Sequence, residues 1–167
     1  MSQALISEDH ADQSAIADLL SPGRCLCQVK SSSKKRLFEF IADVLSRDYE
    51  DFHPSDLVSG MLSREKLGST ALGEGIAIPH CRLDACARPC GVLLTLDDGA
   101  DFDAPDNQLV DLIFALVVPS EATQEHLNLL ADLARLFSRA EFRDEMRGCR
   151  SAKQVYQTAC EWSSRVS

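Results

Sequence analysis

Apolar residues recur every three to four positions in several segments of this chain, which is the spacing of the buried face of an α-helix. The stripe that follows Ser120 consists of Leu127, Leu130, Ala134 and Phe137. Serines at residues 31–33 are typical N-caps and precede the first long helical pattern. We predict five helices, at about Lys34–Arg47, Ser55–Lys66, from Ser120 onward, Arg139–Arg147 and Ser151–Trp162.

Other segments show the pattern of β-strands, bounded by turn residues. The predicted strands are Arg24–Val29, Ile76–Pro79, Gly91–Leu96 and Val110–Val118. In the first of them, the alternation places Cys25, Cys27 and Val29 on one face. The last is almost wholly apolar, so we expect a central strand that is covered on both faces.

The order of these elements is one strand, two helices, three strands and three helices, which predicts an α/β fold. We expect three α/β/α layers, with a mixed sheet of about four to five strands and helices on both faces. Residues 1–16 are polar and acidic without a clear period, and are predicted to be a flexible N-terminal extension. Residues 17–163 are long enough for one domain with a single core.

Composition and charge narrow the class of protein. The chain has 17 Lys and Arg against 26 Asp and Glu, a net charge of −9, whereas nucleic acid is bound by clustered basic residues. It lacks any run of about eighteen apolar residues, so we expect no membrane insertion. The first ten residues do not resemble a secretion signal, and we expect a cytoplasmic protein. Its seven cysteines are therefore expected to be reduced and to pack as small hydrophobic residues.

His80 is the sharpest candidate for chemistry. It ends the stretch Gly-Ile-Ala-Ile-Pro-His at residues 75–80, after the glycine-rich loop Gly68–Gly75. Pro79 lacks an N–H and belongs at a strand end, so we expect His80 near the carboxyl end of a strand, where open α/β sheets bind ligands. A neutral imidazole is a competent nucleophile near pH 7 because its ordinary pKa is about 6.5. By spacing alone, a purely structural histidine is an equally good interpretation.

Two further residues lie at element boundaries and suit an anion. Arg64, near the end of the second predicted helix, has a planar guanidinium that binds two oxygens and stays charged. His126 lies in the first turns of the helix after Ser120, where a helix N-terminus favours anions. Taken alone, each is more typical of an exposed side chain. Backbone N–H groups of Gly68, Gly73 and Gly75 can also approach an anion, but their spacing is neither a P-loop nor a dinucleotide fingerprint.

A zinc site is the competing interpretation, because His80, Cys81, Cys86 and Cys90 are close in sequence. Structural zinc ligands usually come as two separated Cys pairs, and this spacing is looser. His80 and Cys81 are also adjacent, so in an extended chain they point to opposite sides. Residue types alone leave a hydrolase open, although the chain has no Gly-x-Ser-x-Gly nucleophile elbow.

Two motifs resemble the signature of the type 2 enzyme IIA family of the phosphoenolpyruvate-dependent phosphotransferase system. They are Arg64–Thr70, which reads Arg-Glu-Lys-Leu-Gly-Ser-Thr, and Gly73–His80, which reads Gly-Glu-Gly-Ile-Ala-Ile-Pro-His. The likeness extends from about Ala17 to Trp162 and is greatest to the nitrogen-regulatory enzyme IIA proteins, which are related to the mannitol/fructose-type domains. The chain departs from the family at Cys81, where many relatives have glycine.

The resemblance implies that His80 accepts a phosphoryl group from a phosphohistidine on an HPr-like donor. It also implies that Arg64 and His126 line the same pocket and stabilise that group, in an in-line transfer without metal or cofactor. Because no transporter domain is attached, we expect the protein to act on regulatory targets, in nitrogen- or potassium-type control, rather than in sugar import. The alternative that stays open is a protein-interaction regulator on the same fold that acts independently of phosphorylation.

Overall fold

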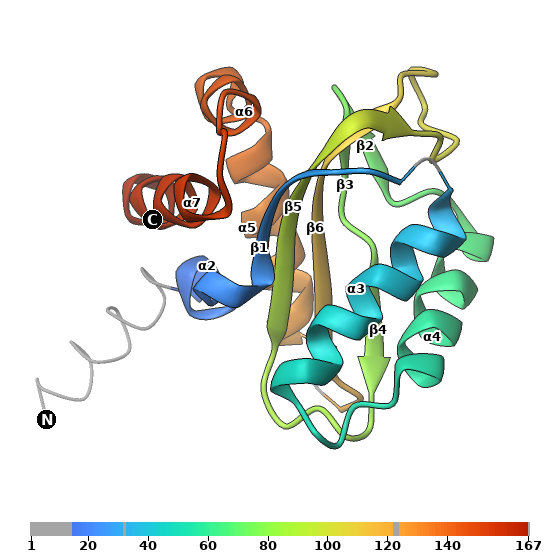
Figure 1. Cartoon of the computed structure of the whole chain (residues 1–167). Helices are drawn as coiled ribbons and strands as arrows, with labels where there is room; N and C mark the ends of the chain where they lie inside the picture. Colours follow the sequence, from blue (N-terminus) through green and yellow to red (C-terminus); the bar gives the residue numbers. More distant parts are fainter. Residues whose placement is uncertain (1–14, 32, 122–123, 167) are drawn as a thin grey trace, which may run out of the picture.

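A mixed β-sheet forms the middle layer of the protein in a computed structural model, which describes residues 15–31, 33–121 and 124–166 (Figure 1). The strands are β1 Cys25–Val29, β2 Ala71–Gly73, β3 Ile76–Ala77, β4 His80–Leu83, β5 Cys90–Ala100 and β6 Val110–Pro119. Their order is β1-β5-β6-β3-β2, and β4 also pairs with β6. β5 and β6 are antiparallel, whereas β3 and β4 both run parallel to β6. Most of the predicted extension, residues 1–14, lies outside the described residues.

Helices cover both faces of this sheet (Figure 1). One face carries α3 Lys34–Asp48 and α4 Pro54–Leu67, and the other carries α2 Ala15–Asp18, α5 Gln124–Phe137, α6 Ala140–Arg147 and α7 Ala152–Val166. A 3₁₀ turn, η1 Pro22–Arg24, leads into β1. The three-layer α/β/α prediction is therefore confirmed. No helix among the described residues combines the length and the apolar character that crossing a bilayer requires.

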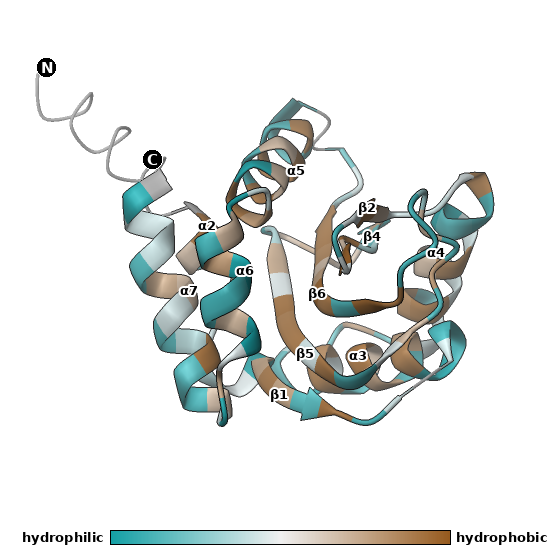
Figure 2. Ribbon diagram, turned by 90° about the horizontal axis from the view of Figure 1, so that it is seen from above, coloured by the Kyte–Doolittle hydropathy of each residue, from teal (hydrophilic) through white to brown (hydrophobic). Residues whose placement is uncertain are grey.

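Strand β6 is the central strand, as its continuous apolar run predicts. Its side chains alternate between two cores: Ile113, Ala115 and Val117 pack with α3 and α4, and Leu112, Phe114 and Leu116 pack with α5, α6 and α7. Burying one large aliphatic or aromatic side chain contributes about 1.5–3 kcal/mol. Figure 2 shows the hydrophobic β5 and β6 between helices whose outer faces are hydrophilic. The position of β6 thus sets the register of every strand beside it.

The sheet has six strands within the described residues, more than the four to five that the sequence predicted. The strands that were not predicted are β2 and β4, of three and four residues. β2 lies inside the segment predicted to be a glycine-rich loop. Gly73 and Gly75, at φ 92° and 78°, form the turn that lets β2 fold back antiparallel onto β3. Elements this short carry too few residues for a recognisable period.

The face predicted for β1 is only partly correct. Cys25 and Cys27 share one face, as predicted, and pack on the side of α5, α6 and α7. Val29 instead packs against the core under α3 and α4. The pairing with β5 shifts register between Leu26 and Val29, and Gln28 has a left-handed φ of 53°. This bulge reverses the alternation, because one extra residue sends the following side chain to the other face.

The stripe predicted for α5 is also rotated. Leu127, assigned to the buried face, is 56% exposed, whereas its neighbour His126 is only 6% exposed. The buried residues of this helix are His126, Leu133, Leu136 and Phe137. Apolar periodicity identified the helix correctly, but a buried polar residue at its start could not be told from a surface one.

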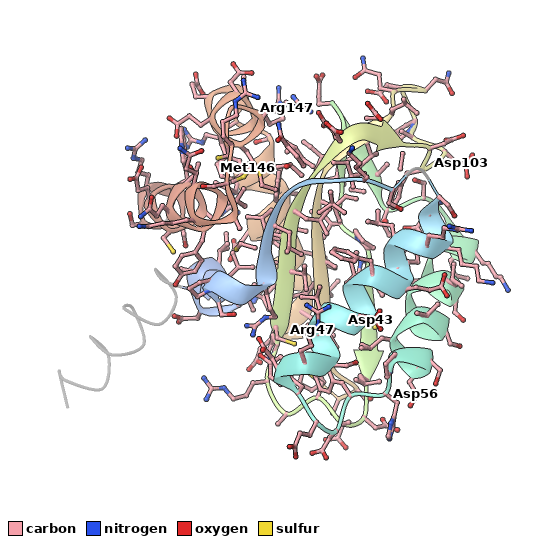
Figure 3. The ribbon with its side chains drawn as sticks, viewed as in Figure 1. Asp43, Arg47, Asp56, Asp103, Met146 and Arg147 are labelled. Carbon is pink, nitrogen blue, oxygen red and sulfur yellow. The ribbon has the colours of Figure 1, made fainter. Side chains whose placement is uncertain are left out.

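Helix α6 is tied to the sheet by Arg147, which is labelled at the upper edge of the molecule in Figure 3. Its guanidinium donates to both carboxylate oxygens of Asp111, at 3.0 Å from Nε to Oδ2 and 3.0 Å from Nη2 to Oδ1. The same Nη2 donates to the carbonyl oxygen of Glu74, in the turn between β2 and β3. Paired donors of this kind add geometric specificity, so the β2–β3 turn is held from outside the sheet.

Gly91→Ala is expected to destabilise the protein by about 1–3 kcal/mol through overpacking. A Cβ at Gly91 would lie 2.5 Å from Cε1 of Phe114, a ring that is fully buried. Gly23→Ala is the matched control, since a Cβ there meets no atom within 4 Å. Urea unfolding of both variants tests the expectation. Equal midpoints for the two would contradict the close approach of β5 to Phe114.

Candidate functional site

His80 is the first residue of β4, and its backbone lies beside the middle of β6. Its Cα pairs with that of Leu116, whose N–H donates to the carbonyl oxygen of Pro79 at 2.9 Å. The prediction of a strand Ile76–Pro79 with His80 near its carboxyl end is therefore only partly correct, because His80 itself begins a second strand. β3 ends at Ala77, because Pro79 has no N–H to continue the ladder, and a new strand starts at His80.

The imidazole of His80 is oriented by its own backbone. Nδ1 lies 2.9 Å from the carbonyl oxygen of Ile78. A carbonyl oxygen can only accept a hydrogen bond, so Nδ1 carries the proton in this contact. In the neutral ring Nε2 then keeps the free lone pair. The half-buried ring therefore presents one defined nucleophilic nitrogen.

Burial and nearby positive charge keep this ring neutral. The pKa of His80 is lowered from its ordinary value, and the largest cause is burial, which disfavours the charged form. Electrostatic interactions with Arg64 and His126 lower the pKa further, while the Ile78 hydrogen bond and the carboxylate of Glu65 oppose the change. Arg64 and His126, the two other residues predicted from the sequence, thus both influence the pKa of His80.

Arg64 and His126 reach this site from opposite layers of the fold. Arg64 lies in the last turn of α4, and its Nη1 donates to the carbonyl oxygen of Gly68 at 2.9 Å. One donor of the fork is used in this way, which orients the guanidinium and leaves its other N–H groups for an anion. His126 lies in the first turn of α5 and is buried, not exposed as a lone surface histidine would be.

Glu65 is a residue of the site that sequence reasoning missed. Its side chain is only 5% exposed, and its Oε2 lies 3.1 Å from Nζ of Lys34. Its Oε1 accepts a hydrogen bond from the N–H of Thr70 at 3.2 Å and another from the Thr70 hydroxyl. A carboxylate in the last turn of a helix faces the negative end of the helix dipole, so it needs such partners. That mismatch is the signal by which the sequence points to Glu65.

Two glycines of the loop lie beside residues that contact the β2–β3 turn. A Cβ on Gly75 would lie 2.5 Å from Nη2 of Arg147, and one on Gly73 would lie 3.4 Å from Oδ2 of Asp106. The absent side chain of Gly75 therefore makes room for the Arg147 contact that holds the β2–β3 turn, whereas the left-handed φ of 92° favours glycine at position 73. Packing therefore requires glycine at position 75, whereas a Cβ at Gly68 would meet no atom within 4 Å.

The cysteines beside His80 pack in the opposite direction. Cys81, Cys86 and Cys90 are buried in the core under α3 and α4, and burial raises the pKa of the Cys81 thiol to about 12. As expected for adjacent residues of a strand, His80 and Cys81 point apart. Among the residues that the structure describes, no group of three or more His, Cys, Asp or Glu side chains is placed to hold a metal ion.

Comparisons with known proteins identify the family that this chain resembles in sequence and in fold. A model of the family described as "Phosphoenolpyruvate-dependent sugar phosphotransferase system, EIIA 2" matches residues 18–160. The "Nitrogen regulatory protein" of Pseudomonas aeruginosa is 46% identical over 142 residues, which cover 85% of this chain and 92% of that protein. The crystal structure of nitrogen regulatory protein IIA-Ntr from Neisseria meningitidis matches at TM-score 0.81 and 37% identity, covering 87% of this chain and 99% of that one.

A more distant structure shares the fold. The crystal structure of IIA mannitol from Escherichia coli matches at TM-score 0.70 and 22% identity, covering 84% of this chain and 98% of that one. The arrangement of sheet and helices is thus common to proteins that differ at most positions.

Arg64→Met is expected to raise the pKa of His80, because the substitution removes a cation that lowers it. An NMR titration of the imidazole through the acid range measures the midpoint. Arg36→Met is the control, since Arg36 is an exposed cation of α3 that does not act on His80. An unchanged midpoint in Arg64→Met would mean that Arg64 does not contribute to the field at His80.

The same lowered pKa predicts a pH dependence of stability. Protonation of His80 is less favourable in the folded than in the unfolded chain. Above the unfolded pKa of about 6.5, this group therefore does not lower the free energy of unfolding. Stability is expected to fall as the pH drops below that value and through the lowered folded pKa. Urea unfolding at a series of pH values should therefore show a smaller acid loss in His80→Gln than in the wild type. Parallel acid losses in the two proteins would refute the assignment.

Proposed function

The chain belongs to the EIIA type 2 family of the phosphoenolpyruvate-dependent sugar phosphotransferase system, and from this we propose that it is a phosphocarrier whose acceptor is Nε2 of His80. The donor in this proposal is a phosphohistidine on an HPr-like protein. The observation that carries it is the hydrogen bond from Nδ1 of His80 to the Ile78 carbonyl oxygen, since this bond leaves the lone pair on Nε2.

The transfer that we propose is an in-line displacement at phosphorus. The lone pair of Nε2 forms the new N–P bond while the N–P bond of the donor breaks and its electron pair returns to the donor nitrogen. The ring of His80 gains positive charge in this step, and the Ile78 carbonyl oxygen, which accepts from Nδ1–H, stabilises that charge. A ring that is neutral before the step is ready to attack.

Arg64 and His126 balance the charge on the oxygens of the transferring group in this scheme. Both act on the electrostatics of His80, and the phosphoryl oxygens would enter the same field. Phosphoryl transfer needs little covalent help from a protein, so positioning and charge stabilisation account for most of the catalysis. No step uses a metal or an organic cofactor.

Regulation is the output that we propose, in the cytoplasm and through target proteins, in nitrogen- or potassium-type control. Relatives that cover most of the chain are named nitrogen regulatory proteins, which supports this over sugar import. The net charge of −9 does not favour nucleic acid as a partner. Residues 17–163 form the proposed functional unit.

Three exposed leucines lie in or next to the segments that carry the site residues, and we propose them as contacts for a protein partner. Leu67, Leu72 and Leu127 are 84%, 47% and 56% exposed. Leu67 follows Arg64 at the end of α4, Leu72 lies on β2, and Leu127 is next to His126. An exposed apolar patch, when its members are contiguous, marks a docking site. These leucines are equally compatible with the alternative, a regulator that acts independently of phosphorylation. For such a regulator, the affinity for the target would be the same in wild type, His80→Ala and His80→Glu.

His80→Gln is expected to abolish acid-labile labelling when the protein is incubated with phosphoenolpyruvate, enzyme I and an HPr-type donor. His53→Gln is the matched control, because His53 is an exposed histidine before α4. Wild type and His53→Gln should each take up one phosphate. Labelling of His80→Gln at the wild-type level would show that another residue is the acceptor.

Arg64→Lys is expected to slow phosphoryl transfer to His80 by about a hundredfold, the usual cost of removing one charge-stabilising donor. A lysine keeps the charge but not the planar fork. Rapid-quench measurement of labelling gives the rate, with Arg36→Lys as the control. A wild-type rate in Arg64→Lys would show that the guanidinium of Arg64 is not needed for phosphoryl transfer and only contacts Gly68.

A further inference from the structure

We propose that Glu65 is a positioning residue that sets the tautomer of His80 through a chain of hydrogen bonds via Thr70 and Ile78. The chain starts at a buried carboxylate and ends at Nδ1 of the imidazole. This inference rests on the proposed function, since it explains how the attacking nitrogen is selected. The tautomer itself, however, exists and can be measured without any phosphoryl transfer.

The first link holds the carboxylate of Glu65 in place. Its Oε2 pairs with Nζ of Lys34 at 3.1 Å, and both side chains are largely buried, at 5% and 19% exposure. The Lys34 ammonium also lies 5.0 Å from the centre of the Phe102 ring and 3.7 Å from Oδ2 of Asp103. Figure 3 shows Asp103 near the start of α3. These contacts of Lys34 restrict the orientation of the Glu65 carboxylate.

The second link fixes the backbone of Thr70. Oε1 of Glu65 accepts from the Thr70 N–H at 3.2 Å and from the Thr70 hydroxyl. Thr70 is 5% exposed, so no solvent competes for these donors. Two hydrogen bonds to one carboxylate oxygen restrict both the side-chain rotamer and the peptide plane of Thr70. The direction of the Thr70 carbonyl follows.

The third link carries this orientation to the imidazole. The Thr70 carbonyl oxygen accepts from the N–H of Ile78 at 3.0 Å, and the Ile78 carbonyl oxygen accepts from Nδ1 of His80 at 2.9 Å. Ile78 precedes Pro79, which restricts it to extended conformations and leaves its peptide little freedom. A change at Glu65 is therefore passed to the acceptor that selects Nδ1–H over Nε2–H.

The position of Glu65 argues against a purely structural role. A carboxylate in the last turn of α4 opposes the helix dipole, and burial adds a desolvation cost. An apolar residue would avoid both costs. Glu65 also acts directly on His80, since its negative charge opposes the lowering of the pKa by burial, Arg64 and His126. Position and charge therefore both connect this carboxylate to the acceptor.

The test compares the His80 tautomer in four variants with that in the full-length wild type. Long-range ¹H–¹⁵N NMR on ¹⁵N-labelled protein, above the pKa of the ring, separates Nδ1–H from Nε2–H. Glu65→Gln removes the charge but keeps the shape, and Thr70→Val removes the hydroxyl. Thr70→Ser retains the hydroxyl as a conservative rescue. Asp48→Asn is the matched control, because it breaks another ion pair, with Nη1 of Arg24 at 2.6 Å, that has no member in this chain.

We expect the wild type and Asp48→Asn to hold mainly the Nδ1–H tautomer, with Thr70→Ser close to them. In Glu65→Gln the ratio of Nδ1–H to Nε2–H is expected to fall about tenfold, the equilibrium value of one good hydrogen bond. Thr70→Val should show a smaller fall, because the Thr70 N–H still donates to Glu65. The rate constant for labelling at saturating donor should fall in the same order, with an unchanged KM for the donor.

A wild-type tautomer ratio in folded Glu65→Gln would overturn the proposal. If that variant does not fold, a wild-type ratio in Thr70→Val overturns it equally, and a shifted ratio there supports it. The two proposals fail separately. A wild type that takes up no phosphate but shows the tautomer shift in Glu65→Gln would reject the phosphocarrier function alone. Normal labelling with an unshifted tautomer would reject the role of Glu65 alone.

Discussion

The candidate site depends on the break that Pro79 makes in the chain beside β6. Without an N–H, this residue cannot continue the ladder that β3 begins, so one segment pairs with β6 twice, first at Leu112 and Ile113 and again from Leu116 onward. The carbonyl of the residue before the break is turned to the imidazole instead of to a strand. A proline inside a sheet is normally a defect, and here it creates the acceptor that orients His80.

The charges around His80 are balanced for an incoming anion. Burial, Arg64 and His126 all disfavour a second proton on the ring, and Glu65 with the Ile78 carbonyl partly offsets them. A dianionic phosphoryl group bound to Nε2 would bring the negative charge that this field favours. The same field explains why α4 and α5, on opposite faces of the sheet, must both be docked before the site exists. The chemistry of the site therefore depends on the packing of both cores.

Most helices and the two long strands were predictable because each is long enough to show its period. The predicted Lys34–Arg47 and Val110–Val118 correspond to α3 and β6 within one residue at each end. The short β2 and β4, the bulge at Gln28 and the rotated stripe of α5 were missed. These features are set by pairing and packing with distant residues, and three or four residues carry no pattern of their own.

The sequence by itself determined the fold class, the family resemblance and the three candidate residues, because motif and period are properties of neighbours along the chain. Only the tertiary structure decided that the proton of His80 sits on Nδ1, since this depends on where one carbonyl points. It also decided that His126 is buried and that Glu65 belongs to the site. The site is formed by helices from both faces of the sheet and by a strand, and contacts between such distant segments cannot be inferred from spacing along the chain.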